Sequence, residues 1–164
     1  MKKTISILVS MFVIAFNSEV AAQANQPYIA DYSANFTISD QALSTKILEM
    51  WKDWDDNQFD RHDYMADTVE MTFADGTKLK GKMESMEAAK KHRGTFTKVV
   101  STIHAWVPLK STDRDQNLVC IWGKDESTTA DGKVEKSDIH EVWFFNKDGK
   151  VVDMLQWKAK FGDE

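Results

Sequence analysis

The chain has 164 residues, which is enough for one domain. Hydrophobic residues make up 42% of it and charged residues 29%, and this composition argues for a globular protein and against disorder. A formal net charge of −5 makes nucleic acid an unfavourable partner, because phosphate binding depends on lysine and arginine. Cys120 is the single cysteine, so no disulfide can form within the chain.

The first 24 residues have the pattern of a secretory signal peptide. Lys2 and Lys3 give it a positive start, an apolar run covers 5–16, and Ala22-Gln23-Ala24 supplies small residues for signal peptidase. The apolar run is shorter than the about 20 residues that a membrane-spanning helix needs. We therefore expect cleavage after Ala24, a periplasmic or secreted protein, and no membrane attachment after cleavage. Residues 25–38 follow, and we interpret them as a tether or an extended arm.

Three stretches of the remaining chain have the pattern of helices. Apolar residues recur at spacings of four, four and three in the first, which predicts one buried stripe. Small polar residues precede the first and second stretches, where they can cap free N–H groups. Gly94 fits a left-handed cap at the end of the third. The predicted helices cover 39–56, 61–66 and 83–93.

After Gly94 the pattern changes to runs of β-branched and aromatic residues. Asp131-Gly132 and Asp148-Gly149 separate the last runs and are strong hairpin signals, and Pro108 is expected to end an earlier strand. Helices first and an antiparallel meander afterwards predict an α+β fold, with three helices packed on a curved sheet in one domain over 39–164. The predicted strands cover 68–73, 77–80, 98–107, 118–128, 134–145 and 151–161.

If both Asp-Gly turns are two-residue loops, the pairing of the last three strands can be counted outward from the turns. Trp122 then lies opposite Glu141, and Glu141 lies opposite Gln156. Both faces of this sheet are apolar in the middle, and the helices can cover only one of them. We therefore expect a homodimer through the second, outer face. A slip of one residue in either hairpin would exchange the faces.

The chain resembles the NTF2-like superfamily, in its SnoaL-like branch, over about residues 39–162. The resemblance implies a conical domain with a pocket between helices and sheet, and frequent dimerisation through the outer sheet face. Members include isomerases, cyclases, dehydratases and binding proteins without activity, so the fold does not fix the function. The resemblance rests on residues 48–54 (LEMWKDW), 59–60 (FD), 65–69 (MADTV) and 142–151 (VWFFNKDGKV).

Bacterial ketosteroid isomerases of that superfamily use a carboxylate base, a tyrosine and a protonated carboxylic acid. On the resemblance, the tyrosine position falls on Trp54, the base position on Met71 and the acid position on Glu141. One suitable group of three remains. The comparison argues against steroid isomerisation and leaves Glu141 as the residue of interest.

Glu141 and His104 are the candidate catalytic residues. A carboxyl group desolvated in a pocket has a raised pKa and can donate a proton near neutral pH, while His104 could act as acid, base or ligand-orienting donor. The simpler interpretations are a structural glutamate paired with Gln156 or a helix cation, and a hydrogen-bonded core or rim histidine. His140 is expected on the opposite face from Glu141, in the dimer. The candidate pocket residues are Trp54, Asp67, Trp106, Trp122, Trp143, Met154 and Gln156.

Asp60, His62, Asp63 and Asp67 crowd one segment, but their spacing matches no metal signature. The sequence has no phosphate-binding loop and no nucleophile elbow, so we expect neither a cofactor nor a metal. Three functions stay open. They are a binding protein for a small hydrophobic molecule, an isomerase, dehydratase or cyclase that uses Glu141, and an interaction module without activity.

Overall fold

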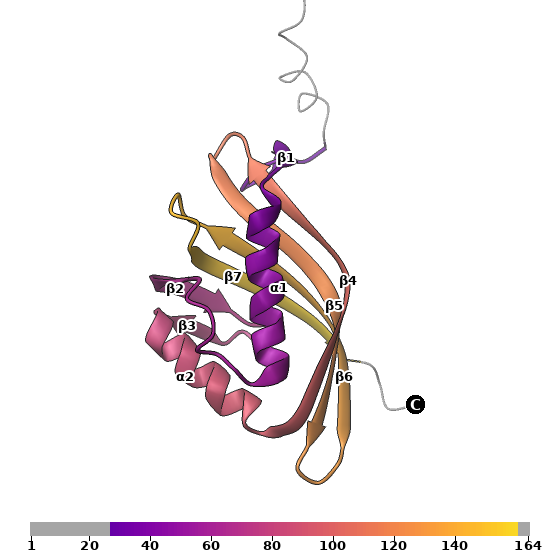
Figure 1. Cartoon of the computed structure of the whole chain (residues 1–164). Helices are drawn as coiled ribbons and strands as arrows, with labels where there is room; N and C mark the ends of the chain where they lie inside the picture. The colour runs from indigo at the N-terminus through magenta and orange to yellow at the C-terminus, as the bar shows by residue number, and fades with distance from the viewer. Residues whose placement is uncertain (1–26, 161–164) are drawn as a thin grey trace, which may run out of the picture. The chain divides into compact units, whose positions relative to one another are not determined.

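A computed structural model describes residues 27–160, so the predicted signal peptide lies outside the described residues. The chain divides into two units, residues 1–34 and 35–164, and the fold is that of the second unit. In residues 27–160 no helix is long and apolar enough to cross a membrane. The second unit has an α+β architecture in which α1 lies across one face of a curved sheet and α2 lies beside β2 and β3 (Figure 1).

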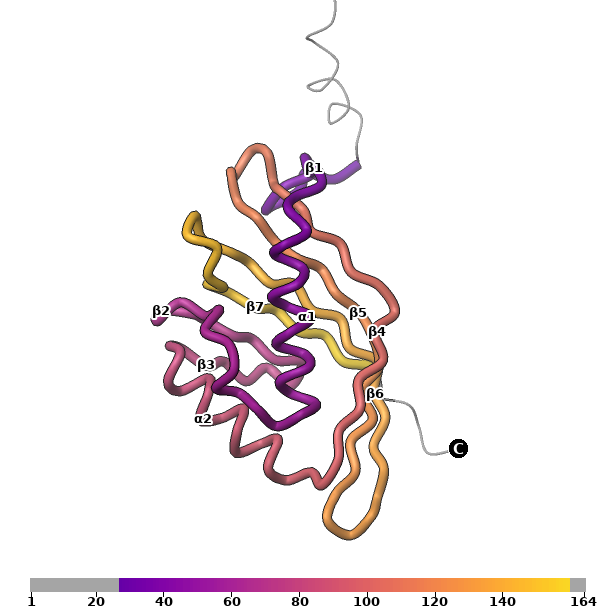
Figure 2. Tube along the Cα trace, in the orientation of Figure 1, coloured from indigo at the N-terminus to yellow at the C-terminus, as the bar shows by residue number. Residues whose placement is uncertain are grey.

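The sheet has seven strands in the order β1-β4-β5-β6-β7-β2-β3 within the described residues. Neighbours are antiparallel except β2 and β7, which are parallel. The long strands β4, β5 and β6 bend along their length, which gives the sheet its curvature (Figure 2). The bounds are β1 Phe36–Ile38, α1 Gln41–Asp56, β2 Met65–Thr72, β3 Lys78–Lys80, α2 Lys82–Arg93, β4 Phe96–Ser111, β5 Gln116–Thr129, β6 Val134–Phe145 and β7 Val151–Lys160.

Helix α1 forms where the apolar stripe predicted it. The Asp40 side chain accepts a hydrogen bond from the Ala42 N–H at 2.9 Å and so caps the helix. Ile47 is completely buried at its centre, and the stripe packs on the sheet to form the main core. The buried core residues are Leu43, Ile47, Trp51, Val69, Met71, Val119, Ile121, Trp143, Phe145, Val151 and Met154.

The described residues form two helices, and the expected helix over 61–66 is wrong. The side chains of this segment contact other elements instead. The His62 Nδ1 atom lies 2.7 Å from Asp53 Oδ2, and the Tyr64 hydroxyl donates to Glu49 Oε2 at 2.5 Å. A six-residue polar helix has no apolar stripe to bury and is unstable alone, so these contacts determine the path to β2.

Two smaller expectations also need correction. Gly94 has φ −63° and ψ −13°, so the expected left-handed cap is wrong. The predicted end of a strand at Pro108 is also wrong, because β4 continues through this residue. Proline has no N–H to donate, but its carbonyl accepts from the Ser39 N–H at 3.0 Å. The end of the expected arm forms β1, which pairs with the end of β4.

The predicted register of the first hairpin is wrong by one residue. Thr129 N–H donates to the Lys133 carbonyl at 2.9 Å, and Gly132 has φ 85°, so the turn contains three residues. Trp122 therefore pairs with His140, and Ile121 pairs with Glu141. Every β5 side chain consequently lies on the face opposite to the expected one.

The predicted pairing of the second hairpin is confirmed in its centre. Glu141 pairs with Gln156, and Trp143 pairs with Met154. This turn also encloses three residues, which alone would displace the pairing by one residue. An irregularity between Phe144 and Phe145 restores the predicted pairing beyond it.

Candidate functional site

Glu141 lies in the middle of the inner face, which we define as the sheet face that α1 covers. Its side chain is 6% exposed and accepts three hydrogen bonds. The indole N–H groups of Trp51 and Trp143 donate to Oε2 at 2.8 and 2.9 Å, and the Gln156 amide donates to Oε1 at 2.9 Å. These three partners are neutral donors, and together they join α1, β6 and β7 through one carboxyl group.

Burial raises the pKa of Glu141 above the ordinary glutamate value, and the nearby Asp125 carboxyl group adds to the rise. The three donated hydrogen bonds oppose this rise, because they stabilise the charged form. Trp51 and Trp143 are themselves buried, so the carboxyl group is covered by its own donors. This arrangement fits a structural carboxyl group better than one that meets a substrate.

Asp125 is a second buried carboxyl group on the inner face, nearer to the β5–β6 turn. It is 7% exposed, and its Oδ2 accepts from the Ser127 hydroxyl at 3.0 Å. Its Oδ1 has no hydrogen-bond partner among the described residues, and burial raises the pKa of this carboxyl group. No sequence pattern predicts this buried carboxyl group, because an aspartate among polar strand residues is ordinarily solvated.

The outer face, opposite to α1, carries a row of three rings across β5, β6 and β7. Trp122 pairs with His140 and His140 pairs with Trp157, so the three residues share one register position. The ring centroids lie 5.9 Å apart in the first pair and 5.5 Å apart in the second. Trp122 is 41% exposed and Trp157 is 51% exposed. Large indole surface is therefore available on this face.

A hollow of about 640 Å³ opens beside the ring row. Its walls include Trp122, Leu155, Trp157 and the turn after β2, while His104 and Asp138 add polar groups. This volume lies within the range of about 300–1,000 Å³ that small-molecule pockets occupy. A mostly apolar wall with a few polar groups is typical of such pockets. We call this feature the outer hollow.

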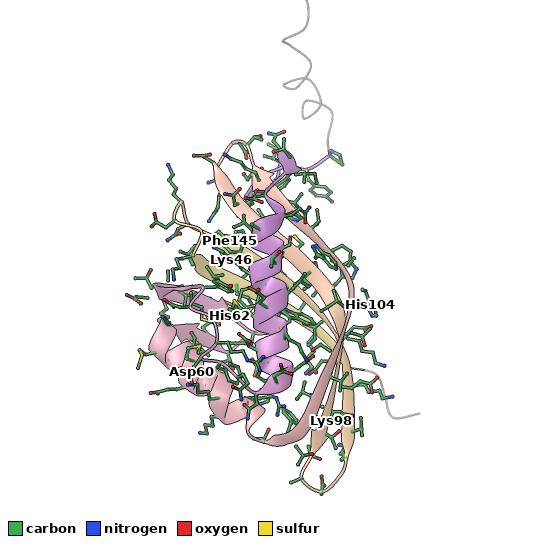
Figure 3. All side chains as sticks on the ribbon, viewed as in Figure 1. Lys46, Asp60, His62, Lys98, His104 and Phe145 are labelled. Carbon is green, nitrogen blue, oxygen red and sulfur yellow. The ribbon has the colours of Figure 1, made fainter. Side chains whose placement is uncertain are left out.

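His104 enters the outer hollow through a β-bulge in β4. Ile103 pairs with Gly123 and Ala105 pairs with Trp122, which leaves His104 as the extra residue. A Cβ atom on Gly123 would meet the Thr102 carbonyl oxygen at 2.5 Å, so only glycine allows this approach of β4 to β5. His104 lies on the side of β4 away from α1 (Figure 3).

Comparison with solved structures identifies the fold. A protein of unknown function from Exiguobacterium sp. 255-15, described as NTF2-like, matches with a TM-score of 0.57 at 16% identity, over 70% of this chain and 98% of that chain. The chain has the NTF2-like fold. A protein from Jannaschia sp. CCS1 assigned as a SnoaL-like polyketide cyclase matches with a TM-score of 0.60 at 10% identity, over 73% and 87% of the two chains.

TerC, co-crystallised with polyporic acid, matches with a TM-score of 0.56 at 16% identity, over 71% of this chain and 91% of that chain. No family model and no curated protein matches this chain. The structural neighbours confirm the NTF2-like resemblance at the level of the fold, and identities this low show the fold alone.

This NTF2-like fold separates the residues that the sequence placed in one pocket. Trp143, Met154 and Gln156 lie with Glu141 on the inner face, whereas His104 and Trp122 line the outer hollow, whose wall also includes Gln156. The observed register therefore divides the predicted pocket residues between the two faces of the sheet. Trp106 pairs with Ile121 and so also belongs to the inner face. Two further predicted residues lie elsewhere: Trp54 contacts Phe59 and His92 at the end of α1, and Asp67 is exposed on β2.

Trp51 and Trp157 complete the two sites and were not among the predicted site residues. Trp51 belongs to the apolar stripe of α1, but only the way α1 lies across the sheet brings it to Glu141. Trp157 pairs with His140 on the outer face, and the observed register adds Trp122 on the other side of His140.

The crowded polar segment after α1 has structural partners in the NTF2-like fold. Lys90 binds Asp60 at 2.7 Å, and both Lys82 and Lys150 bind Asp63. Across residues 27–160, no three His, Cys, Asp or Glu side chains are placed to hold a metal ion. Cys120 is partly buried, and burial raises the pKa of its thiol, which keeps the thiol protonated and weakly nucleophilic.

Proposed function

We propose that this protein binds a small, flat and largely apolar molecule in the outer hollow. The observation that carries the proposal is the ring row beside the hollow, where Trp122 and Trp157 stay 41% and 51% exposed. Exposed indole faces can stack on a flat molecule and lose unfavourable contact with water. The expected ligand is the small hydrophobic molecule predicted from the sequence, but its site is the outer face.

The structural neighbours agree with a small-molecule role for the fold. One is assigned as a SnoaL-like polyketide cyclase, and another was crystallised with polyporic acid. Both statements belong to those proteins. For this chain they support a small organic ligand. The cone with an interior pocket that the resemblance implies stays a prediction.

A neutral flat probe tests the proposal directly. We expect 2-naphthalenemethanol to bind saturably, measured by calorimetry, and we expect Trp122→Ala or Trp157→Ala to weaken binding at least about fivefold, since stacking on an indole contributes about 1 kcal/mol. Trp54→Phe is the matched control, because Trp54 packs at the end of α1 against Phe59. Absence of saturable binding, or equal affinity in the Trp122 and Trp54 variants, would refute the proposal.

The same exposed face supports a second proposal, a homodimer through the outer face. Trp122 and Trp157 expose about 100 and 130 Å² if an indole residue offers about 250 Å². The partly buried residues Val142 and Leu155 extend this apolar surface. The patch approaches the 300–600 Å² of the largest patch on a typical monomer, and a polar rim would complete the about 800 Å² that each partner buries in a stable interface.

Sedimentation equilibrium measures this association. We expect a dimer whose dissociation constant rises at least tenfold in Trp157→Lys, because each partner would then bury an ammonium group in an apolar contact. A wild-type monomer at 100 μM would refute the homodimer. It would leave the outer face to a ligand or to a different protein, as the interaction-module alternative expects.

The enzyme alternative requires a substrate atom within reach of Glu141. Its three donors and 6% exposure argue against that contact, so we place this alternative second to binding. Localisation also remains a proposal: residues 1–24 direct the chain to the periplasm or the medium and are removed after Ala24. N-terminal sequencing of the protein recovered from bacterial periplasm and medium should begin at Asn25.

A further inference from the structure

Strand β4 changes its pairing at a single point, beside the outer hollow. Ile103 and Ala105 pair with the neighbouring residues Gly123 and Trp122, so His104 has no cross-strand partner. The bulge requires glycine at 123, because any Cβ there would meet the Thr102 carbonyl oxygen at 2.5 Å. A β-bulge changes the direction of one side chain, and here that side chain is His104, which lines the hollow.

The polar groups of the outer hollow have unequal roles. His140 lies between the rings of Trp122 and Trp157, at 5.9 and 5.5 Å, and belongs to the aromatic wall. Asp138 lies directly opposite Lys124 on β5, and Lys158 also lines the hollow, so cations share this part of the sheet. His104 is exposed, and the backbone bulge directs it into the hollow. It is the polar group best placed to meet a ligand.

An imidazole beside indole faces selects for a particular ligand. The ring N–H donates to an anionic oxygen, and the interaction strengthens when the imidazole is protonated. The apolar indole wall is complementary to an aromatic ring, and the imidazole N–H is complementary to a carboxylate. Together they favour a ligand that is an aromatic carboxylate. An organic ammonium cannot accept a hydrogen bond from the ring N–H of His104, although Asp138 would attract it.

The geometry points to His104 as the residue that orients the ligand and selects an aromatic carboxylate, through a bulge that Gly123 permits. This inference rests on the proposed binding function of the outer hollow. It assigns His104 to the recognition of an anionic group, which is a role distinct from acid–base catalysis.

Three probes that share a naphthalene ring test the selection at pH 6.0: 2-naphthoate, neutral 2-naphthalenemethanol and 2-naphthylmethylammonium. We expect 2-naphthoate to bind about tenfold more tightly than the neutral probe, as one charge-assisted hydrogen bond provides. His104→Ala should reduce this ratio to below about twofold, because it weakens the binding of 2-naphthoate more than the binding of the neutral probe. His92→Ala, a change of an exposed histidine on α2, is the matched control and should keep the tenfold ratio.

Gly123→Ala provides a second route to the same result. If the variant folds, the displaced bulge should lower the 2-naphthoate preference as His104→Ala does; if it does not fold, the His104 variant alone decides. Asp138→Asn should increase the affinity for 2-naphthoate, because it removes a like charge.

The outcomes distinguish the role of His104 from the binding function of the outer hollow. Binding of the neutral probe with no preference for 2-naphthoate, or a preference that survives His104→Ala, overturns the role of His104 and leaves the binding function intact. Tighter binding of the ammonium probe overturns the carboxylate class in favour of an organic cation. Absence of binding by all three probes overturns the binding function itself.

Discussion

Glu141 can lose its charge without losing its hydrogen bonds, and this predicts an unusual pair of mutants. In Glu141→Gln the amide oxygen can accept from the indoles of Trp51 and Trp143, as Oε2 does at 2.8 and 2.9 Å. The new NH₂ group faces Gln156, whose amide can rotate to present its oxygen. All three contacts are then kept, and the cost of burying a charge is removed.

Glu141→Leu has a similar shape but accepts no hydrogen bond. It leaves two buried indole N–H groups without partners, and each costs about 1–3 kcal/mol. We expect a loss of about 2–6 kcal/mol in the free energy of unfolding, a large share of the 5–15 kcal/mol typical of a domain. Glu141→Gln should change it by less than about 1 kcal/mol at pH 5.

The pH dependence gives the sharper test. Burial raises the pKa of Glu141 in the folded state, so above the ordinary glutamate value the folded protein binds more protons than the unfolded chain. The free energy of unfolding therefore falls as pH rises from that value to the folded-state pKa, and it levels off above. Glu141→Gln lacks this decrease, so it should become more stable relative to wild type as pH rises.

Urea unfolding followed by far-UV circular dichroism between pH 4.5 and 8 measures both effects. Glu126→Gln is the matched control, because Lys124 lowers the pKa of that exposed carboxyl group and the sign of its pH effect is opposite. Equal destabilisation by the Gln and Leu variants, or a Gln variant with the same pH dependence as wild type, would refute the reasoning. Glu141→Gln that is stable but loses a measured activity would restore the enzyme alternative.

Three further predictions concern residues outside the two sheet faces, namely Arg93, Gly132 and Tyr64. Arg93 is 5% exposed and donates to three backbone carbonyls, so Arg93→Lys, which loses the guanidinium fork, should lower the free energy of unfolding by about 2–4 kcal/mol in urea. Gly132 has φ 85°, so Gly132→Ala should cost about 1 kcal/mol in thermal unfolding, whereas Ala130→Gly should cost less. The hydrogen bond to Glu49 raises the pKa of Tyr64 to about 12, so ultraviolet titration should show one late phenol ionisation that moves to lower pH in Glu49→Gln.

Hydrophobic periodicity predicted much of this fold because it reports burial directly. The stripe of Leu43, Ile47 and Trp51 located α1, and alternation located the last three strands to within a few residues. The helix predicted over 61–66 is wrong because a capping aspartate is only a local signal. The side chains of this segment instead bind groups on α1, such as Asp53 and Glu49.

The residues of the candidate site could be predicted only where the strand register could be predicted. Asp-Gly favours both a two-residue turn and a three-residue turn with glycine in the left-handed conformation, so sequence alone does not separate them. At the second hairpin an irregularity between Phe144 and Phe145 compensated, and Glu141 met Gln156 as predicted. At the first hairpin nothing compensated, and Trp122 moved from the inner face to the outer face. One residue in one turn therefore changed the predicted location of the binding surface.

The two proposed roles of the outer face use the same indole surfaces, and this makes them interdependent. Trp122 and Trp157 line the outer hollow and also form the centre of the proposed dimer contact. One indole face cannot stack on a ligand and on a partner at once, so each occupant should weaken the other by the same factor. Saturating 2-naphthalenemethanol is expected to shift sedimentation equilibrium toward monomer, and His92→Ala should respond as wild type does. A shift toward dimer would instead show that a second copy closes over the open hollow and completes the binding site.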